Sequence, residues 1–305
     1  MLLSIIVPHF NSHDGLLKLL DSIPIRDDIE VIIVDDRSDE SSLSVLRGNN
    51  ICYFTNEGKK GAGACRNIGI KRAKGKYVIF ADSDDYFVSD AFRNIDDVMF
   101  GDSDYDVVYF SPVSACAITG EESDRHVMYC NLINDYLSSE YDKTILYDFV
   151  VPWSKLILKS FIDDNSIKFD EVIASNDVMF AMKLNLLSKN IGVSKENIYC
   201  VTRGKGTLTV TRSLEVVNSR FSVEKSRIKF IIDNNLNVET NSFVRIFRLY
   251  SELGFCQLFC YAFSAFIRNE ISFLSPRHRK MLYSPKFLIR YLLKDKSINK
   301  KIYKA

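Results

Sequence analysis

The stretch GAGACRNIGIKRAKGKYVIFADSDDYF, residues 61–87, decides the fold. Its first part has the pattern of a helix, which Gly75 is expected to close, and KYVIFAD then reads as a strand with an unbroken apolar centre. Such a strand is buried on both faces, which is typical of a parallel sheet covered by helices on both sides. Three aspartates, Asp82, Asp84 and Asp85, stand where this strand ends.

The same alternation of strands and helices precedes this stretch. Strands are predicted for LLSIIVP (2–8), IEVIIVDD (29–36) and ICYFTN (51–56), and helices for SHDGLLKLLDSI (12–23) and RSDESSLSVLRG (37–48). Ser38 or Asp39 is the expected cap of the latter helix. This order predicts an α/β fold with a Rossmann-like, mostly parallel sheet flanked by helices.

The pattern is looser beyond residue 101. A strand is predicted for 105–115, an insertion from 126, a helix for PWSKLILKSFIDDNSI (152–167), a helix capped by Ser175 for 175–189, and a strand for 197–201. A loop rich in glycine and threonine follows that strand, and the chain is expected to be mostly helical from Leu214 onward.

Polar side chains follow four of the predicted strands. They lie at residues 8–11, 35–36, 82–85 and from 56 onward. Open parallel sheets bind ligands beyond the carboxyl ends of their strands, so these four loops are expected to converge on one edge.

The three clustered aspartates need a reason, because neighbouring carboxylates repel one another. A divalent cation between them and a bound diphosphate removes the conflict, and Mg²⁺ and Mn²⁺ both prefer oxygen ligands of this kind. The alternative is a solvated acidic turn, in which aspartate and serine are common.

Two further sequence patterns indicate a nucleotide-binding site. Of Asp35 and Asp36, one is expected to brace its loop and the other to accept a hydrogen bond from a base or ribose. The glycines of GKKGAGACRNIG, with Lys59, Lys60 and Arg66 beside a helix start, suit phosphate oxygens. GAGAC half-matches a dinucleotide fingerprint but lacks its third glycine, which disfavours a dehydrogenase.

Four stretches, taken in their order along the chain, resemble those of family 2 glycosyltransferases with the GT-A fold. They are SIIVPHFN, VIIVDDRSDE, GAGACRNIGIKRAKGKYVIFADSDDYF and VPWSKLILKSFI…SNDVMFAMKL. The resemblance is dense over residues 1–100, patchy to 212 and absent beyond. It implies a GT-A domain at 1–212, with nucleotide-sugar binding in 1–100 and the acceptor side in 101–212. A helical C-terminal region would occupy 213–305.

The resemblance also implies roles for single residues. Asp177 would be the general base, Asp84 the metal ligand, and the nucleotide sugar would contact Pro8, Asn11, Asp36, Arg66, Asp82 and Arg203. The segment 207–212 would belong to a mobile loop over the diphosphate.

Four further positions depart from the usual family pattern or have more than one reading. Asn176 replaces the acid that often precedes the base, and His9 departs from the usual stacking residue. Asp85 is an additional acid with an open role. Trp153 is either a core aromatic or a platform for an acceptor sugar.

The implied reaction is inverting transfer, with Mn²⁺ or Mg²⁺, from a UDP-sugar to a hydroxyl of a saccharide or a polyprenyl-diphosphate-linked glycan. Bacterial surface polysaccharide, O-antigen or capsule, is the expected product class. An inactive nucleotide-sugar binding or scaffold module is the alternative from another class. A phosphoacceptor receiver domain is disfavoured by the chain length of 305 residues.

Charge and cysteine usage indicate where the protein acts. Residues 271–305 carry ten Lys or Arg and one Asp. This basic tail predicts either peripheral contact with an anionic membrane or packing on protein, and no nucleic-acid role. The apolar stretch 244–267 is a candidate for burial, a homodimer or a membrane contact. Seven scattered cysteines and an N-terminus that reads as a strand predict a cytoplasmic protein. The membrane alternative for the basic tail would place it on the inner face of the plasma membrane.

Overall fold

The computed structural model describes residues 1–39, 50–139, 144–203 and 213–236. The chain divides into two compact units, Met1–Thr211 and Arg212–Ala305. In the second unit the described part is essentially one helix, α8 (Leu214–Asp233), as predicted for the start of this region. The predicted loop at 207–212, the apolar stretch 244–267 and the basic tail 271–305 lie outside the described residues, as does most of the predicted helix at 37–48.

The first unit is built on one mixed sheet in the order β3-β2-β1-β4-β7-β6-β8-β5. The strands are β1 (Leu3–His9), β2 (Ile29–Asp35), β3 (Ile51–Thr55), β4 (Tyr77–Phe80), β5 (Tyr86–Phe87), β6 (Val107–Cys116), β7 (Lys155–Leu158) and β8 (Ile191–Arg203). The strands β3, β2, β1 and β4 run parallel to one another, whereas β7 is antiparallel to both of its neighbours. The predicted α/β architecture is therefore confirmed, and four of the seven described strand pairings are parallel, so the sheet is more mixed than the expected mostly parallel one.

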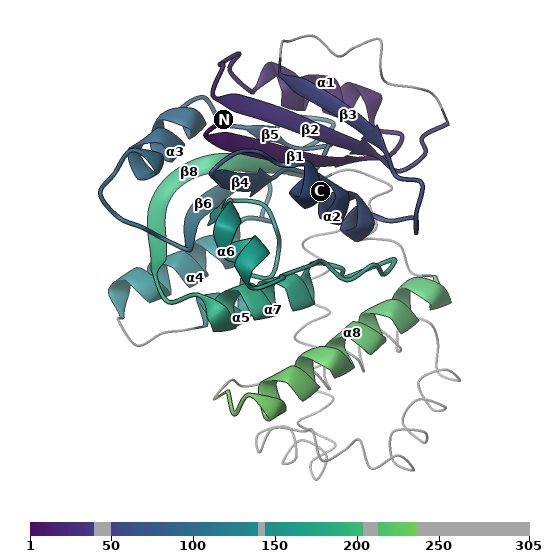
Figure 1. Cartoon of the computed structure of the whole chain (residues 1–305), viewed down its shortest axis with the longest axis vertical. Helices are drawn as coiled ribbons and strands as arrows, with labels where there is room; N and C mark the ends of the chain where they lie inside the picture. Colours follow the sequence, from purple (N-terminus) through teal and green to yellow (C-terminus); the bar gives the residue numbers. More distant parts are fainter. Residues whose placement is uncertain (40–49, 140–143, 204–212, 237–305) are drawn as a thin grey trace. The chain divides into compact units, whose positions relative to one another are not determined.

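Helices cover both faces of the parallel strands. The described helices of the first unit are α1 (His13–Asp21), α2 (Ala62–Arg72), α3 (Ala91–Met99), α4 (Val127–Ser138), α5 (Ile145–Asp148), α6 (Lys159–Asp164) and α7 (Val178–Leu187). Helix α1 connects β1 to β2, whereas α2 returns the chain from β3 to β4, and the two helices lie on opposite sides of these strands (Figure 1). Leu16 and Leu19 of α1 are buried, as its amphipathic pattern predicts.

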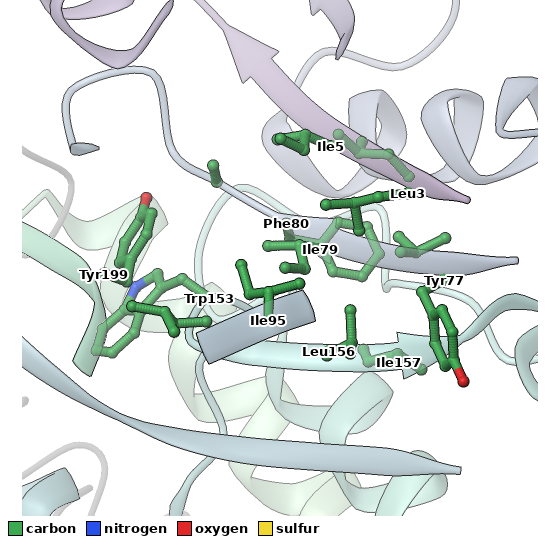
Figure 2. Packing of buried hydrophobic residues seen from close by; sticks show 14 of the residues in the cluster. Leu3, Ile5, Tyr77, Ile79, Phe80, Ile95, Trp153, Leu156, Ile157 and Tyr199 are labelled. Atoms are coloured by element: carbon green, nitrogen blue, oxygen red, sulfur yellow. The ribbon is translucent and has the colours of Figure 1, made fainter. Parts of the chain in front are cut away.

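The core runs through the middle of the sheet without interruption. Figure 2 shows side chains of β1, β4 and β7 side by side, including Leu3, Ile79 and Leu156, all of which are buried. Because these strands are apolar on both faces, they have to lie in the centre of the sheet, and the polar residues collect at the strand ends. The register places His9 opposite Asp35 at one such end.

The predicted helix at 152–167 is wrong in its first half. Residues 155–158 form β7, which pairs with β4 and β6, and only 159–164 are helical as α6. Its short apolar run, KLIL, satisfies both a helical and a strand pattern. Pairing with two neighbouring strands decides the outcome, because it buries this run on both faces.

Two predicted helix boundaries also need correction. Helix α2 ends at Arg72, so Gly75 does not close it. A Cβ on Gly75 would lie 2.6 Å from the backbone nitrogen of Ser4, which shows that this glycine serves close packing against β1. Helix α7 has Asp177 as its N-cap residue instead of the predicted Ser175.

No helix in the described part of the chain is long and apolar enough to cross a membrane.

Candidate active site

The acidic loop, residues 82–85, follows β4 directly and contains carboxylates in three different settings. Asp85 is only 1% exposed, and its Oδ1 accepts a hydrogen bond of 2.7 Å from the backbone N–H of Thr202 on β8. The hydroxyl of Thr202 donates to the carbonyl oxygen of Asp84, also at 2.7 Å. Burial, together with the charges of Asp82 and Asp84, raises the pKa of Asp85 well above its ordinary value. Asp85 therefore braces the loop against β8 and is not open to a ligand.

Asp84 is the open carboxylate of this loop. Its side chain is exposed, and no other described residue donates a hydrogen bond to it. Crowding by protein on its remaining sides, and then the charge of Asp82, raise the pKa of Asp84. A cation bound here would relieve that unfavourable charge.

A divalent metal fits the residues that are present. Within the described residues, no three His, Cys, Asp or Glu side chains are grouped as metal ligands. Mg²⁺ and Mn²⁺ are commonly held by one or two carboxylates together with substrate phosphates, so they do not require such a group. The lone open carboxylate of Asp84 matches this kind of site.

The two aspartates after β2 both hold loops. Asp35 accepts hydrogen bonds from the backbone and the hydroxyl of Ser38, which is the bracing role expected for one of the pair. Asp36 accepts from the Asn56 side chain and from the backbone N–H of Gly61, both at 2.7 Å. Asp36 thus ties the end of β3 and the start of α2 to its own strand, and a carboxylate can accept further bonds from a ligand.

The end of β1 offers an aromatic face that the sequence patterns did not single out. Pro8 and His9 are buried within the strand, and burial lowers the pKa of His9. Phe10, by contrast, is 45% exposed, and the Lys60 ammonium lies 4.0 Å from the centre of its ring. Its only signal in the sequence is an aromatic residue directly after a buried strand.

Asn11 fixes the loop beyond this ring. It has a φ of 48°, and its side chain exchanges two hydrogen bonds with Asp39, at 2.8 and 2.9 Å. Its backbone N–H donates to the hydroxyl of Ser38 at 2.9 Å. The loops after β1 and β2 are therefore joined, as their common edge predicts.

A buried arginine connects the acidic loop to the segment before α7. Arg66 of α2 is 5% exposed; its Nη2 pairs with Asp82 at 2.6 Å and its Nη1 donates to the Asn176 side chain at 2.8 Å. The guanidinium also lies over the ring of Phe169, 5.3 Å from its centre. Its Nε–H is buried without a partner among the described residues, a cost that a ligand oxygen would remove.

Asp177 begins α7 but does not cap it through its side chain. The carboxylate is partly buried and accepts no hydrogen bond from any other described residue. Burial raises the pKa of Asp177, and the negative charge of Asp82 adds to this rise. The positive charges of Arg66 and Lys155 oppose it. A carboxylate with a raised pKa and no partner is a competent general base.

Lys155 was not predicted to belong to the site. It lies in β7, is 1% exposed, and its Nζ donates to the carbonyl oxygens of Phe149 and Val151, both at 2.6 Å. Burial lowers the pKa of Lys155 to about 7, although Asp177 counteracts this. Nothing in the run SKLIL distinguishes this lysine from a solvated one, so only the tertiary structure identifies it.

Trp153 takes the first of its two predicted alternatives, a core aromatic. It is 1% exposed and stacks on Tyr199, with ring centres 5.9 Å apart; Figure 2 shows the two rings together. It also contacts the rings of Tyr129 and Phe149. A platform for an acceptor sugar has to present a ring face to solvent, so this alternative is wrong. Tyr199 in turn accepts a hydrogen bond from the backbone N–H of Asp82, and Trp153 therefore supports the acidic loop from inside.

Two arginines lie near the end of β8. Arg203 forms an ion pair of 2.6 Å with Asp124 at the surface, and it is not in the network around Arg66. Arg125, which the sequence patterns missed, donates to the carbonyl oxygen of Thr202 at 2.9 Å, and its charge opposes the rise in the pKa values of Asp84 and Asp85. The acidic loop thus has a positively charged neighbour.

Gly63 allows α2 to approach the segment before α7. A Cβ at this position would lie 2.2 Å from the carbonyl oxygen of Asp170, and a backbone atom cannot move aside cheaply. We expect Gly63→Ala to destabilise the protein by about 1–3 kcal/mol, as overpacking does, and to lower the melting temperature in thermal unfolding. Gly58→Ala is the control, because its Cβ would meet only an ordinary contact of 3.5 Å with Asn56. Equal melting temperatures for the two variants would contradict this packing role.

Comparison with known proteins places this chain in a family. Residues 4–166, just over half of the chain, match the family described as Glycosyl transferase family 2. A curated relative, poly(ribitol-phosphate) beta-glucosyltransferase of Bacillus spizizenii, is 31% identical over 218 residues. These residues are 65% of this chain and 32% of the relative, so the chain spans about a third of that protein's length.

Solved structures share the fold. Staphylococcus aureus TarS 1–349 in complex with UDP-GlcNAc has a TM-score of 0.63 at 23% identity, covering 83% of this chain and 72% of that one. The mannosyltransferase PcManGT from Pyrobaculum calidifontis, in complex with GDP-Man and Mn²⁺, has a TM-score of 0.50 at 15% identity, covering 96% and 86%. The fold expected from the sequence is thereby confirmed, and the family match over residues 4–166 shows that the chain belongs to glycosyl transferase family 2.

Proposed function

We propose that this protein is a metal-dependent, inverting glycosyltransferase that moves a sugar from a UDP-sugar to a hydroxyl group of a bacterial cell-wall polymer. One observation carries the proposal: Arg66 joins Asp82 of the acidic loop to Asn176, the residue before Asp177. The buried Arg66 guanidinium thereby links a donor-side carboxylate to the residue next to the candidate base. Asp82 and Asn176 are far apart in the sequence.

A UDP-sugar is the proposed donor. TarS, which shares the fold, was solved with UDP-GlcNAc, and this supports the choice of nucleotide. The exposed ring of Phe10 offers a stacking face for the nucleotide base. The Asp36 carboxylate can still accept hydrogen bonds from the N–H groups of that base. Pro8 and Asn11 shape the same edge, while Arg66 and Asp82 are assigned to the diphosphate and the sugar.

The proposed reaction is a single displacement. The Asp177 carboxylate takes the proton from the acceptor hydroxyl, whose oxygen forms a bond to the anomeric carbon. The bond between that carbon and the diphosphate oxygen breaks, and its electron pair leaves with UDP. Attack opposite the leaving group inverts the anomeric configuration. The positive charge of Arg66 lies beside Asp177 and favours the ionised form that the base requires.

Asp84 is the proposed ligand of Mn²⁺ or Mg²⁺. A bound cation would neutralise charge that develops on the leaving diphosphate. Arg125, held by the carbonyl oxygen of Thr202, adds a fixed positive charge on the same side of the acidic loop. Asp85 contributes by keeping this loop on β8.

The proposed acceptor is a hydroxyl of a polyol-phosphate polymer. The support is the relative from Bacillus spizizenii, which is a poly(ribitol-phosphate) beta-glucosyltransferase. Because Trp153 is buried, an aromatic platform at that residue is not part of the acceptor site. Arg203, at the surface end of β8, is a cation that suits phosphate groups once its pair with Asp124 opens.

The test is a screen of UDP-sugars for UDP release, with and without Mn²⁺. Poly(ribitol phosphate) and a polyprenyl-diphosphate-linked saccharide serve as separate acceptors. We expect UDP release from at least one donor to require the metal and to rise severalfold with the polymer. Donor binding without turnover on either acceptor would instead identify a binding or scaffold module.

A further inference from the structure

Asn176 occupies a position that controls a buried charge. Its Oδ1 accepts a hydrogen bond of 2.8 Å from Nη1 of Arg66, whose Nη2 pairs with Asp82 at 2.6 Å. Both Asn176 and Arg66 are buried, so neither side chain is free to exchange this contact for water. The backbone carbonyl of Asn176 also accepts from the N–H of Asp170, which fixes the segment just before α7.

The amide of Asn176 orients the Arg66 guanidinium without neutralising its positive charge. A carboxylate at this position would form an ion pair with Arg66 and neutralise it. With an amide, the positive charge of Arg66 is left to act on two carboxylates, those of Asp82 and Asp177. A hydrogen bond from a charged donor to a neutral acceptor still fixes geometry, because the guanidinium presents its N–H groups in a rigid plane.

We propose that Asn176 is a positioning residue: its neutral amide holds the Arg66 guanidinium between the acidic loop and the start of α7 without pairing off its charge, which stays available to the Asp177 carboxylate. The contacts of Asn176 and Arg66 do not depend on the proposed function. The effect on Asp177 rests on the proposed function only because Asp177 is the proposed base.

The charges that face Asp177 decide the direction of the effect. They are Arg66 on α2, Asp82 in the acidic loop and Lys155 on β7. The two cations favour the ionised carboxylate, whereas Asp82 and burial oppose it. An acid at position 176 places a negative charge next to Asp177 and also forms an ion pair with Arg66. Both changes make the Asp177 carboxyl group harder to ionise.

The sharpest test is Asn176→Asp, which keeps the shape of the side chain and adds one negative charge. Carboxyl-carbon NMR on aspartate-labelled protein, with Asp177 assigned through Asp177→Asn, gives the pKa of Asp177 without any need for turnover. We expect this pKa to rise by about one pH unit in Asn176→Asp. The acid limb of the pH–rate profile is expected to move to higher pH by the same amount, because the base has to be deprotonated.

A matched control and a second variant complete the test. Asn197→Asp adds the same charge at an exposed side chain and is expected to leave the pKa of Asp177 unchanged. Arg66→Gln removes the charge that Asn176 orients, and it is expected to raise the pKa of Asp177 even if Asn176→Asp does not fold.

The two proposals fail in different ways. An unchanged pKa of Asp177 in Asn176→Asp and Arg66→Gln overturns the positioning role, whether or not the wild-type protein transfers sugar. If the pKa of Asp177 rises in these variants but the wild-type protein turns over none of the UDP-sugars, the positioning role stands and the proposed function is overturned. A shifted acid limb without a shifted pKa also contradicts the proposal, because the limb would then belong to another group.

Discussion

Asp177→Asn is expected to reduce the rate of sugar transfer by about 10²–10⁴-fold, the usual contribution of a general base. The amide has the shape of the carboxylate but cannot take the proton of the acceptor hydroxyl. Donor affinity is expected to remain within about threefold of the wild type, because the contacts proposed for UDP lie on the acidic loop, α2 and the end of β1. The measurements are steady-state transfer with the donor and acceptor found in the screen, and calorimetry with UDP.

The stability of this variant is expected to change little. Asparagine and aspartate are about equally good N-cap residues, and the Asp177 side chain makes no capping hydrogen bond. Asp164→Asn is a suitable control, since it makes the same chemical change at the exposed end of α6. A variant at Asp177 that transfers sugar at the wild-type rate would show that another group removes the proton.

The pH dependence gives an independent check on the same residue. Burial raises the pKa of Asp177, while Arg66 and Lys155 restrain that rise. The ionised form is the active one, so transfer is expected to increase with pH through this pKa and then to level off. In Asp177→Asn the residual rate is expected to lose this dependence. An acid limb that survives in the variant would have to come from a different residue.

The parallel half of the fold was predictable because its signals are local. The mainly apolar runs at residues 3–9, 29–35 and 77–80 are buried strands in the structure, and each ends where a polar loop was expected. Strand β7 was not predictable in this way. Its four residues fit a helical pattern equally well, and pairing with β4 and β6, which are distant in sequence, decides its conformation.

The candidate site divides along the same line. The acidic groups at 35–36 and 82–85 were located because they lie at the ends of strands, and the resemblance to family 2 glycosyltransferases then singled out Asp36 and Asp84. The partnership of Arg66 with Asn176 spans 110 residues, and no local pattern announces it. Lys155 and Arg125 were missed because burial and tertiary contacts, rather than their neighbours in the sequence, give them their electrostatic roles. Long-range charge networks are therefore the part of a site that a single sequence reveals least.

Asp84→Asn is expected to abolish the metal-dependent part of donor turnover, which is a loss of at least about 100-fold when the cation contributes several kcal/mol to the leaving group. The amide keeps the size of the side chain but removes the negative charge that attracts the cation. The crowding that raises the pKa of Asp84 shows that its charge is unfavourable without a partner, so its removal is not expected to destabilise the fold. Thermal unfolding without metal checks this point.

The decisive measurement for Asp84 separates metal binding from nucleotide binding. Electron paramagnetic resonance reports free Mn²⁺, and in the presence of UDP the wild type is expected to take up one ion that Asp84→Asn does not. Asp21→Asn, at an exposed position on α1, is the control for the loss of one negative charge and is expected to bind the ion normally. Because Asp85 is committed to Thr202 and Asp82 to Arg66, neither can replace Asp84 without breaking its own contact. Retained Mn²⁺ uptake and activity in Asp84→Asn would therefore exclude a metal role for the open carboxylate of this loop.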